Sequence, residues 1–115
     1  MNNKLKTPAV DQLFDAILSI KDKEECFGFF EDLCTINELL SLSQRFEVAK
    51  MLREHRTYLD IAEKTGASTA TISRVNRSLN YGNDGYDKVF ERLNISSPSR
   101  CIPEGLLCKI IYKRR

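Results

Sequence analysis

The sequence predicts an all-α protein of about six helices, and three observations support this. Apolar residues recur every three or four positions along most of the chain, which is the period of a helix with one buried face. Threonine, serine and proline residues that favour helix starts precede several of these stretches. No convincing strand stands beside them, apart from a brief β-leaning run near the C-terminus.

The first two helices are predicted from an apolar stripe and a start signal. Thr7 suits a helix cap, and Pro8 suits the first helical position, where no amide hydrogen is needed. The apolar residues of 10–18 then follow at helical spacing. A charged link at residues 21–25 leads into a second helix, whose apolar stripe contains three phenylalanines within residues 27–33.

A capping box predicts the start of a long third helix. Thr35 can accept a bond from the backbone of Glu38, whose side chain can reach back to the Thr35 amide. The helix should run to about Glu54, and its apolar positions lie on more than one side. We therefore expect it to be enclosed on several sides. A short sixth helix is predicted at Tyr86–Leu93, after a turn-rich break.

Residues 57–79 between these elements predict a helix-turn-helix. Ala62 is small enough for two helices to pack closely there. Gly66 lies where the chain must adopt a positive φ to leave the first helix. Ser68 can cap the second helix, and Ile72 should point back into the angle between the two helices.

The second helix of this motif has the side chains that a major groove requires. A helix this rich in threonine and serine has a poor intrinsic propensity, so something other than helix stability favours these residues. Short hydroxyl groups and guanidiniums can contact base edges and phosphates. The predicted phosphate contacts are Thr57, Ser68, Thr71 and Arg77, the predicted base contacts are Thr69, Ala70 and Ser73, and Arg74 could bind a phosphate or order the motif.

Charge distribution gives this prediction modest support. The whole chain carries a net charge of +2, but residues 1–49 hold five basic and nine acidic side chains. Residues 50–79 hold six basic against three acidic side chains, and residues 80–115 hold seven against four. The positive charge therefore lies on the helix-turn-helix and the tail, although an ordinary solvated surface would explain it as well.

Length and composition limit the number of domains and the class of protein. A chain of 115 residues predicts one domain, which we place at residues 1–93, with a partly mobile C-terminal extension at residues 94–115. No stretch is apolar enough for a membrane helix, and the N-terminus lacks a secretory apolar core, so we expect a cytoplasmic protein. An enzyme is not expected, because no phosphate loop, acid pair or Cys-His motif is present.

The four cysteines predict neither a metal site nor a cofactor. Cys26, Cys34, Cys101 and Cys108 do not have the spacing of a tight zinc knuckle, and His55 is near none of them in sequence. Free thiols are the default in a reducing compartment. We expect Cys26 and Cys34 to act as small core residues.

The aromatic content of the first half of the chain favours a homodimer. Five phenylalanines are more large rings than a small three-helix core accommodates, and a second copy would bury the surplus. Two recognition helices about 34 Å apart would also read two half-sites on one face of double-stranded DNA. A monomer with a compact core is the alternative.

Two other functions use the same helical hairpin. The first alternative is the DNA-binding module of a transposase or recombinase. The acidic residues of this chain show no two-metal cleavage site, so such a module would need a partner subunit for catalysis. The second alternative is an interaction module that binds another protein through the same hairpin. Protein interfaces favour aromatic anchors, and Tyr58 and Tyr81 are the only candidates near the motif in the sequence. Binding through several phosphates would separate DNA from protein recognition by its steep salt dependence.

Residues 33–93 resemble the tryptophan repressor family. The most specific similarity is Gly66-Ala67-x-x-Ala70-Thr71-Ile72-Ser73-Arg74-x-x-x-Ser78-Leu79, which is similar to the turn and recognition helix of that family without a gap. Upstream motifs around residues 33–38, 43–45 and 48–52 are similar to a branch of related proteins from Gram-positive bacteria. The resemblance implies an intertwined, all-helical homodimer that binds operator DNA through residues 68–79 as a transcription regulator.

The resemblance also locates an effector pocket, where this chain departs from the family. In the repressor, two arginines sandwich the tryptophan; Arg74 matches one, but Gln44 stands at the other position, with Arg45 beside it. Ser78 matches a residue near the ligand's amino group, whereas Val75 replaces a glycine and would intrude on the ligand. We therefore expect no response to tryptophan, and a different effector is left open.

Overall fold

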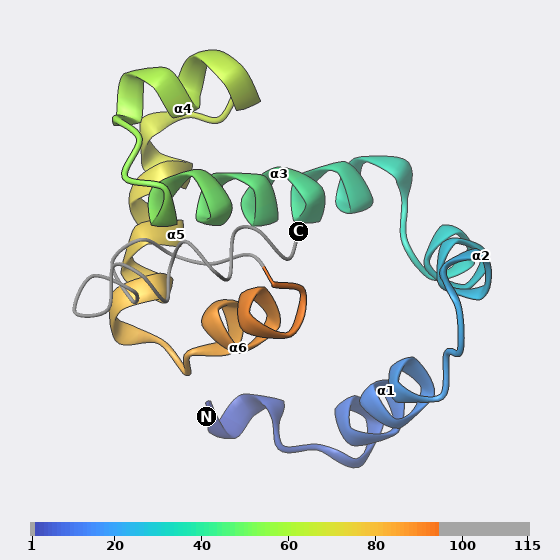
Figure 1. The fold of residues 1–115 in the computed structure, drawn as a ribbon. Helices are drawn as coiled ribbons and strands as arrows, with labels where there is room; N and C mark the ends of the chain where they lie inside the picture. The colour runs from blue at the N-terminus through green and yellow to red at the C-terminus, as the bar shows by residue number, and fades with distance from the viewer. Residues whose placement is uncertain (1, 95–115) are drawn as a thin grey trace. The chain divides into compact units, whose positions relative to one another are not determined.

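The structure, a computed structural model, describes residues 2–94 as a 3-10 turn followed by six α-helices (Figure 1). These described residues contain no strand, so the all-α prediction is confirmed. The predicted β-leaning run, Cys101, Cys108 and all but the first residue of the predicted extension lie outside the described residues. The elements are η1 (Asn3–Leu5), α1 (Pro8–Leu18), α2 (Lys23–Leu33), α3 (Ile36–Arg53), α4 (Tyr58–Thr65), α5 (Thr69–Tyr81) and α6 (Gly85–Arg92).

The predicted helix starts are confirmed by their hydrogen bonds. The Thr7 hydroxyl accepts from the Val10 amide at 3.2 Å, and Pro8 opens α1. At the start of α3, the Thr35 amide donates to the Glu38 carboxylate at 2.8 Å, and the Glu38 amide donates to the Thr35 hydroxyl at 3.1 Å. These bonds from Thr35, of which the backbone bond is the larger cause, hold the pKa of Glu38 below its ordinary value.

The described residues fall into two compact units, one ending at Leu40 and the other beginning at Ser41. In the first unit no described residue is buried, and large apolar side chains are exposed on α1, α2 and the first turns of α3. The expectation that α3 is enclosed on several sides is therefore wrong for its N-terminal half within one chain. Cys26 and Cys34 are half-buried free thiols outside the core cluster, so their predicted core role is not met within one chain either.

The second unit builds a core around the C-terminal half of α3. Val48, Ile61 and Ile72 are fully buried, and they come from α3, α4 and α5 respectively. Close packing of such side chains fixes how the three helices cross. Among the described residues, the buried apolar cluster consists of Val48, Ala49, Met51, Ile61, Ala67, Ile72, Val75, Leu79 and Phe90, with Phe46, Leu52, Ala62 and Tyr86 packed against it.

An ion pair that no sequence pattern indicated joins α3 to α6, and a hydrogen bond from the same arginine joins α3 to α5. The Arg53 guanidinium donates to both carboxylate oxygens of Asp87, at 2.9 and 2.8 Å, and also to the Leu79 carbonyl at 3.1 Å. Asp87 is only 7% exposed. A bidentate pair this sheltered from water is directional and much less screened than an ion pair on the surface.

A helix that crosses a bilayer needs about 20 predominantly apolar residues. Among the described residues, no helix is both long enough and apolar enough to cross a membrane.

Candidate nucleic-acid interface

α4 and α5 form the helix-turn-helix that the sequence predicts. The Gly66 amide closes α4 by donating to the Ala62 carbonyl at 2.9 Å, and Gly66 adopts φ 74° and ψ 6°. This is the left-handed region, where a side chain costs conformational energy. The Ser68 hydroxyl then accepts from the Thr71 amide at 3.2 Å and caps α5. α4 ends at Thr65 and α5 begins at Thr69, so three residues form the turn.

α5 has a buried face and an exposed face. Ile72, Val75 and Leu79 recur at helical spacing and are 0 to 4% exposed, so they hold the helix against the core. Between them, the predicted base contacts Thr69, Ala70 and Ser73 are exposed, as are Arg74 and Arg77, while Thr71 is half-buried. The exposed face is thus polar and free of large apolar groups along its first two turns.

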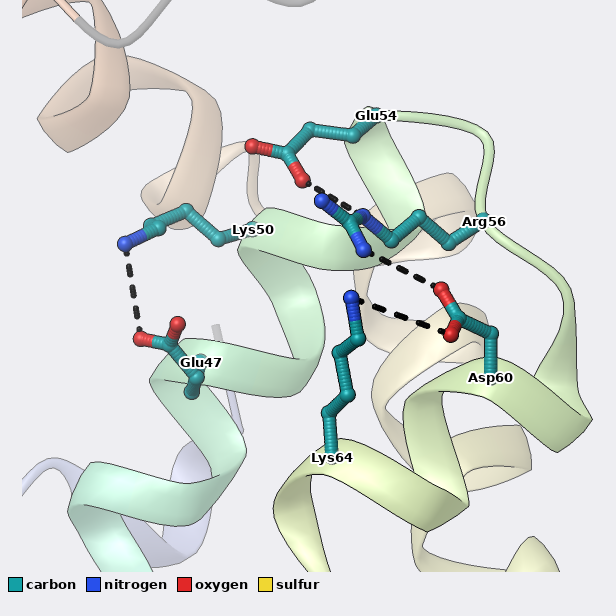
Figure 2. Close-up of polar contacts among 6 residues, drawn as sticks. All are labelled: Glu47, Lys50, Glu54, Arg56, Asp60 and Lys64. Atoms are coloured by element: carbon teal, nitrogen blue, oxygen red, sulfur yellow. Dashed lines mark hydrogen bonds and ion pairs between the residues drawn. The ribbon is translucent and has the colours of Figure 1, made fainter.

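Most cations near the motif are already paired with carboxylates. Lys50 lies 3.4 Å from Glu47, and Lys64 lies 4.0 Å from Asp60, as Figure 2 shows. The Arg56 guanidinium bonds Glu54 and Asp60, each at 3.1 Å, and the Asp60 bond contributes most to raising the pKa of Arg56. These pairs neutralise much of the positive charge that the sequence places on this segment.

Arg74 and Arg77 differ from those cations. Within residues 2–94, neither guanidinium forms a hydrogen bond or an ion pair, and both side chains are exposed on α5. An internal partner for Arg74, one of the roles considered from the sequence, is therefore absent from the described part of the chain. The two exposed guanidiniums are the groups on this helix that an anion would meet first.

The hydroxyl groups that are predicted to contact phosphates also form the helix caps. Thr57 accepts from the Asp60 amide at 3.1 Å, which leaves its own hydroxyl hydrogen available for a phosphate oxygen. The Ser68 hydroxyl donates to the Thr71 hydroxyl at 3.1 Å, so Thr71 is the member of this pair whose hydrogen can point outward.

The candidate effector residues have different surroundings in the described part of the chain. Gln44 donates its amide to the Thr65 carbonyl at 3.1 Å, Arg45 is exposed, and Val75 is directed into the core at 2% exposure. Ser78 lines a mainly apolar cavity of about 460 Å³ that the other candidates do not line. The rest of its lining is Phe46, Gly82, Asn83, Gly85, Tyr86 and Val89.

Two contacts of the motif were not visible in the sequence. The Arg53–Asp87 pair joins residues 34 positions apart, and the Gln44–Thr65 bond joins residues 21 positions apart. No local signal connects such residues.

The sequence of this chain is similar to known proteins over most of its length. The sequence profile described as Trp repressor protein matches residues 8–94. The uncharacterized protein YerC of Bacillus subtilis is 63% identical over 91 residues, which are 79% of this chain and 88% of YerC.

Two solved structures are similar to this chain. A TrpR-like protein from Eubacterium eligens has 87% sequence identity and a TM-score of 0.78, with 80% of this chain and 95% of that chain covered. A protein from Staphylococcus aureus, described as a candidate Trp repressor, has 56% identity and a TM-score of 0.79, with 82% and 94% covered.

Proposed function

Because the chain belongs to the Trp repressor family, a family of DNA-binding regulators, we propose that it is a transcription regulator that binds operator DNA. We propose further that it acts as a repressor and binds as a homodimer. Within this function, residues 1–93 form the DNA-binding and dimerisation domain, and residues 94–115 are an extension to it.

The exposed face of α5 is the observation that carries this proposal. It combines small hydroxyl and methyl groups near the helix start with the guanidiniums of Arg74 and Arg77, which have no partner among residues 2–94. A major groove admits one helix, and small side chains let the helix backbone approach base edges closely. Cations on the same face supply the phosphate attraction that dominates affinity.

Each exposed residue then has a role that can be tested. Thr69, Ala70 and Ser73 contact base edges, with the methyl groups of Thr69 and Ala70 suited to thymine. Arg74 and Arg77 bind phosphates. Thr57, Ser68 and Thr71 lie at the two helix starts, where helix N-termini favour anions. Thr57 and Thr71 donate their hydroxyl hydrogens to further phosphates, and Ser68 joins them when its hydroxyl turns from Thr71 to the DNA.

Exposed apolar side chains support the homodimer. Leu18 is 82% exposed, Phe27 67% and Ile36 75%, all within the unit that ends at Leu40. Burying such groups against a second copy removes apolar surface from water, which is the main favourable term in protein association. The twofold symmetry of the dimer would then match two half-sites.

Tryptophan is not the effector in this proposal. Gln44 and Val75 stand at two positions where the repressor has an arginine and a glycine, and both side chains are engaged within the chain.

The test is selection of bound sequences from random duplex DNA by the full chain, followed by salt titration of the best duplex. We expect a palindromic consensus and a linear fall of log affinity with log salt. Arg77→Ala should weaken binding to all duplexes alike and reduce the salt slope by about one. Lys88→Ala, which removes one positive charge from an exposed position on α6, is the matched control and should leave the slope unchanged.

Base contacts should behave differently from phosphate contacts. Ser73→Ala should relax the consensus at one position in each half-site, with a small change in the salt slope. Absence of any enriched duplex at low salt would overturn the proposed function, and an enriched consensus without a repeat would overturn the homodimer.

A further inference from the structure

Two polar contacts connect α3 to the helix-turn-helix, one beside its turn and one in the last turn of α5. Near the middle of α3, the Gln44 amide donates to the carbonyl of Thr65, the last residue of α4. At the end of α3, Arg53 donates to the carbonyl of Leu79, in the last turn of α5, while it holds Asp87 of α6. One helix therefore contacts the motif through hydrogen bonds at its turn and at its far end.

The Thr65 contact reaches into the turn itself. The Thr65 hydroxyl donates to the Ile61 carbonyl at 2.7 Å and accepts from the Ala67 amide at 3.1 Å. Gln44 thus fixes a residue that already ties the end of α4 to the start of the turn. A displacement of Thr65 would move Ala67 and with it the start of α5.

Apolar packing alone would fix this arrangement less tightly. The surfaces between α3 and the motif are formed by side chains such as Val48, Met51, Ile72 and Val75. Hydrophobic burial is non-directional and tolerates small rotations, whereas hydrogen bonds weaken steeply when their angle changes. Gln44 and Arg53 are nine residues apart on α3, about 13 Å along the axis. Rocking the motif on α3 would break at least one of the two contacts.

We propose that Gln44 and Arg53 are positioning residues, which fix the orientation of the helix-turn-helix on α3 so that α5 is preorganised for duplex DNA. This inference rests on the proposed function. It also assigns a role to Gln44, considered above as an effector residue: its amide holds the recognition motif from within the chain. Neither residue is placed in contact with DNA.

The test uses substitutions that leave the net charge unchanged. Gln44→Ala removes the first contact, and Arg53→Lys keeps the charge but loses the planar fork that serves two acceptors. Their controls are Ser19→Ala, which removes an exposed hydrogen bond to Ala16 in the first unit, and Arg92→Lys on the exposed side of α6. Binding to the selected duplex is measured at a temperature where circular dichroism finds all variants folded.

We expect Gln44→Ala to bind about threefold and Arg53→Lys about tenfold more weakly than the unaltered chain, with both controls unchanged. Amide hydrogen exchange without DNA should accelerate at Ala67 and Thr71 in Gln44→Ala, and at Gly82 in Arg53→Lys. Unchanged affinity of the folded variants, with only a lower melting temperature, would overturn the inference and leave the contacts purely structural.

The two proposals fail in different ways. If the unaltered chain enriched no duplex, the proposed function would fall and this inference with it. If the unaltered chain bound DNA while both variants bound equally well and exchanged at the same rate, the positioning role alone would be wrong.

Discussion

The unit that ends at Leu40 and the unit that begins at Ser41 both consist of helices with apolar stripes, but they differ in how far their apolar side chains are exposed. In the second unit, Ile61 and Ile72 are fully buried, whereas in the first Leu18 is 82% and Phe27 is 67% exposed. Apolar periodicity is present in both units. Periodicity therefore predicts a helix and its apolar face, but it does not predict whether the same chain provides the surface that covers this face.

The largest expected effect is on the core of the second unit. Ile72→Ala should destabilise the protein by about 4 kcal/mol, because it removes buried methyl groups and leaves a cavity between α5 and the core. Leu18→Ala, the matched change in the first unit, should cost less than about 0.5 kcal/mol in dilute solution. Urea denaturation measures both free energies of unfolding.

The costs of Leu18→Ala and Ile72→Ala should depend differently on protein concentration. If Leu18 is covered in a homodimer, the cost of Leu18→Ala should rise with concentration while that of Ile72→Ala changes less. Equal costs for the two substitutions in dilute solution would mean that both helices are buried within one chain.

The next effect concerns the ion pair of the second unit. Asp87→Ala should cost about 3 kcal/mol, because it leaves the sheltered Arg53 guanidinium without this carboxylate. Glu47→Ala breaks the Lys50–Glu47 pair, whose side chains are 29% and 50% exposed, and should cost less than about 0.5 kcal/mol. Thermal unfolding compares the two variants, and a similar loss in both would show that burial does not separate these pairs.

A smaller effect is expected at the helix caps, which have the same chemistry in both units. Ser68→Ala should cost about 1 kcal/mol, because the Thr71 amide loses its acceptor at the start of α5. Thr7→Ala removes the equivalent bond from α1, and it should lower helix content with little change in the unfolding of the second unit. Circular dichroism and urea denaturation together distinguish these outcomes.

The smallest effect is a pH dependence at the start of α3. The pKa of Glu38 is lowered in the folded chain by its bonds to Thr35, so the ionised carboxylate stabilises this helix start. That contribution is complete above the unfolded pKa of about 4.3 and is lost as pH falls through the lower folded value. Glu38→Gln should flatten this dependence, and an NMR titration of Glu38 that gives an ordinary pKa would contradict it.

Individual residues show how far the sequence could predict the fold and the interface. The caps at Thr7, Thr35, Thr57 and Ser68, and the positive φ of Gly66, follow from bonds and steric limits within four residues. The helix ends were less certain: α3 ends at Arg53 and α6 begins at Gly85, each one residue from its predicted limit. At the start of α6, Asp84 adopts φ 61° without a side-chain cap, which no start signal indicated.

The assignment of DNA contacts from the sequence remains a prediction, but the exposure of the residues it needs is now known. Thr69, Ala70, Ser73, Arg74 and Arg77 are all exposed, because α5 turns Ile72, Val75 and Leu79 to the core. Helical spacing made this division predictable. Lys50, Arg56 and Lys64 pair with carboxylates two to four positions away, which is local spacing. The pairing of Arg53 was not predictable, because its partner Asp87 lies in a different helix.

The six helices, most of their caps, the glycine turn and the polar face of α5 follow from the amino-acid sequence, because each depends on residues within a few positions of one another. Three further features depend on the packing of the helices: which apolar stripes are buried, the bonds of Arg53 to Asp87 and Leu79, and the bond of Gln44 to Thr65. Those contacts join residues 21 to 34 positions apart. Packing of the helices brings such residues together, and no local pattern encodes that packing.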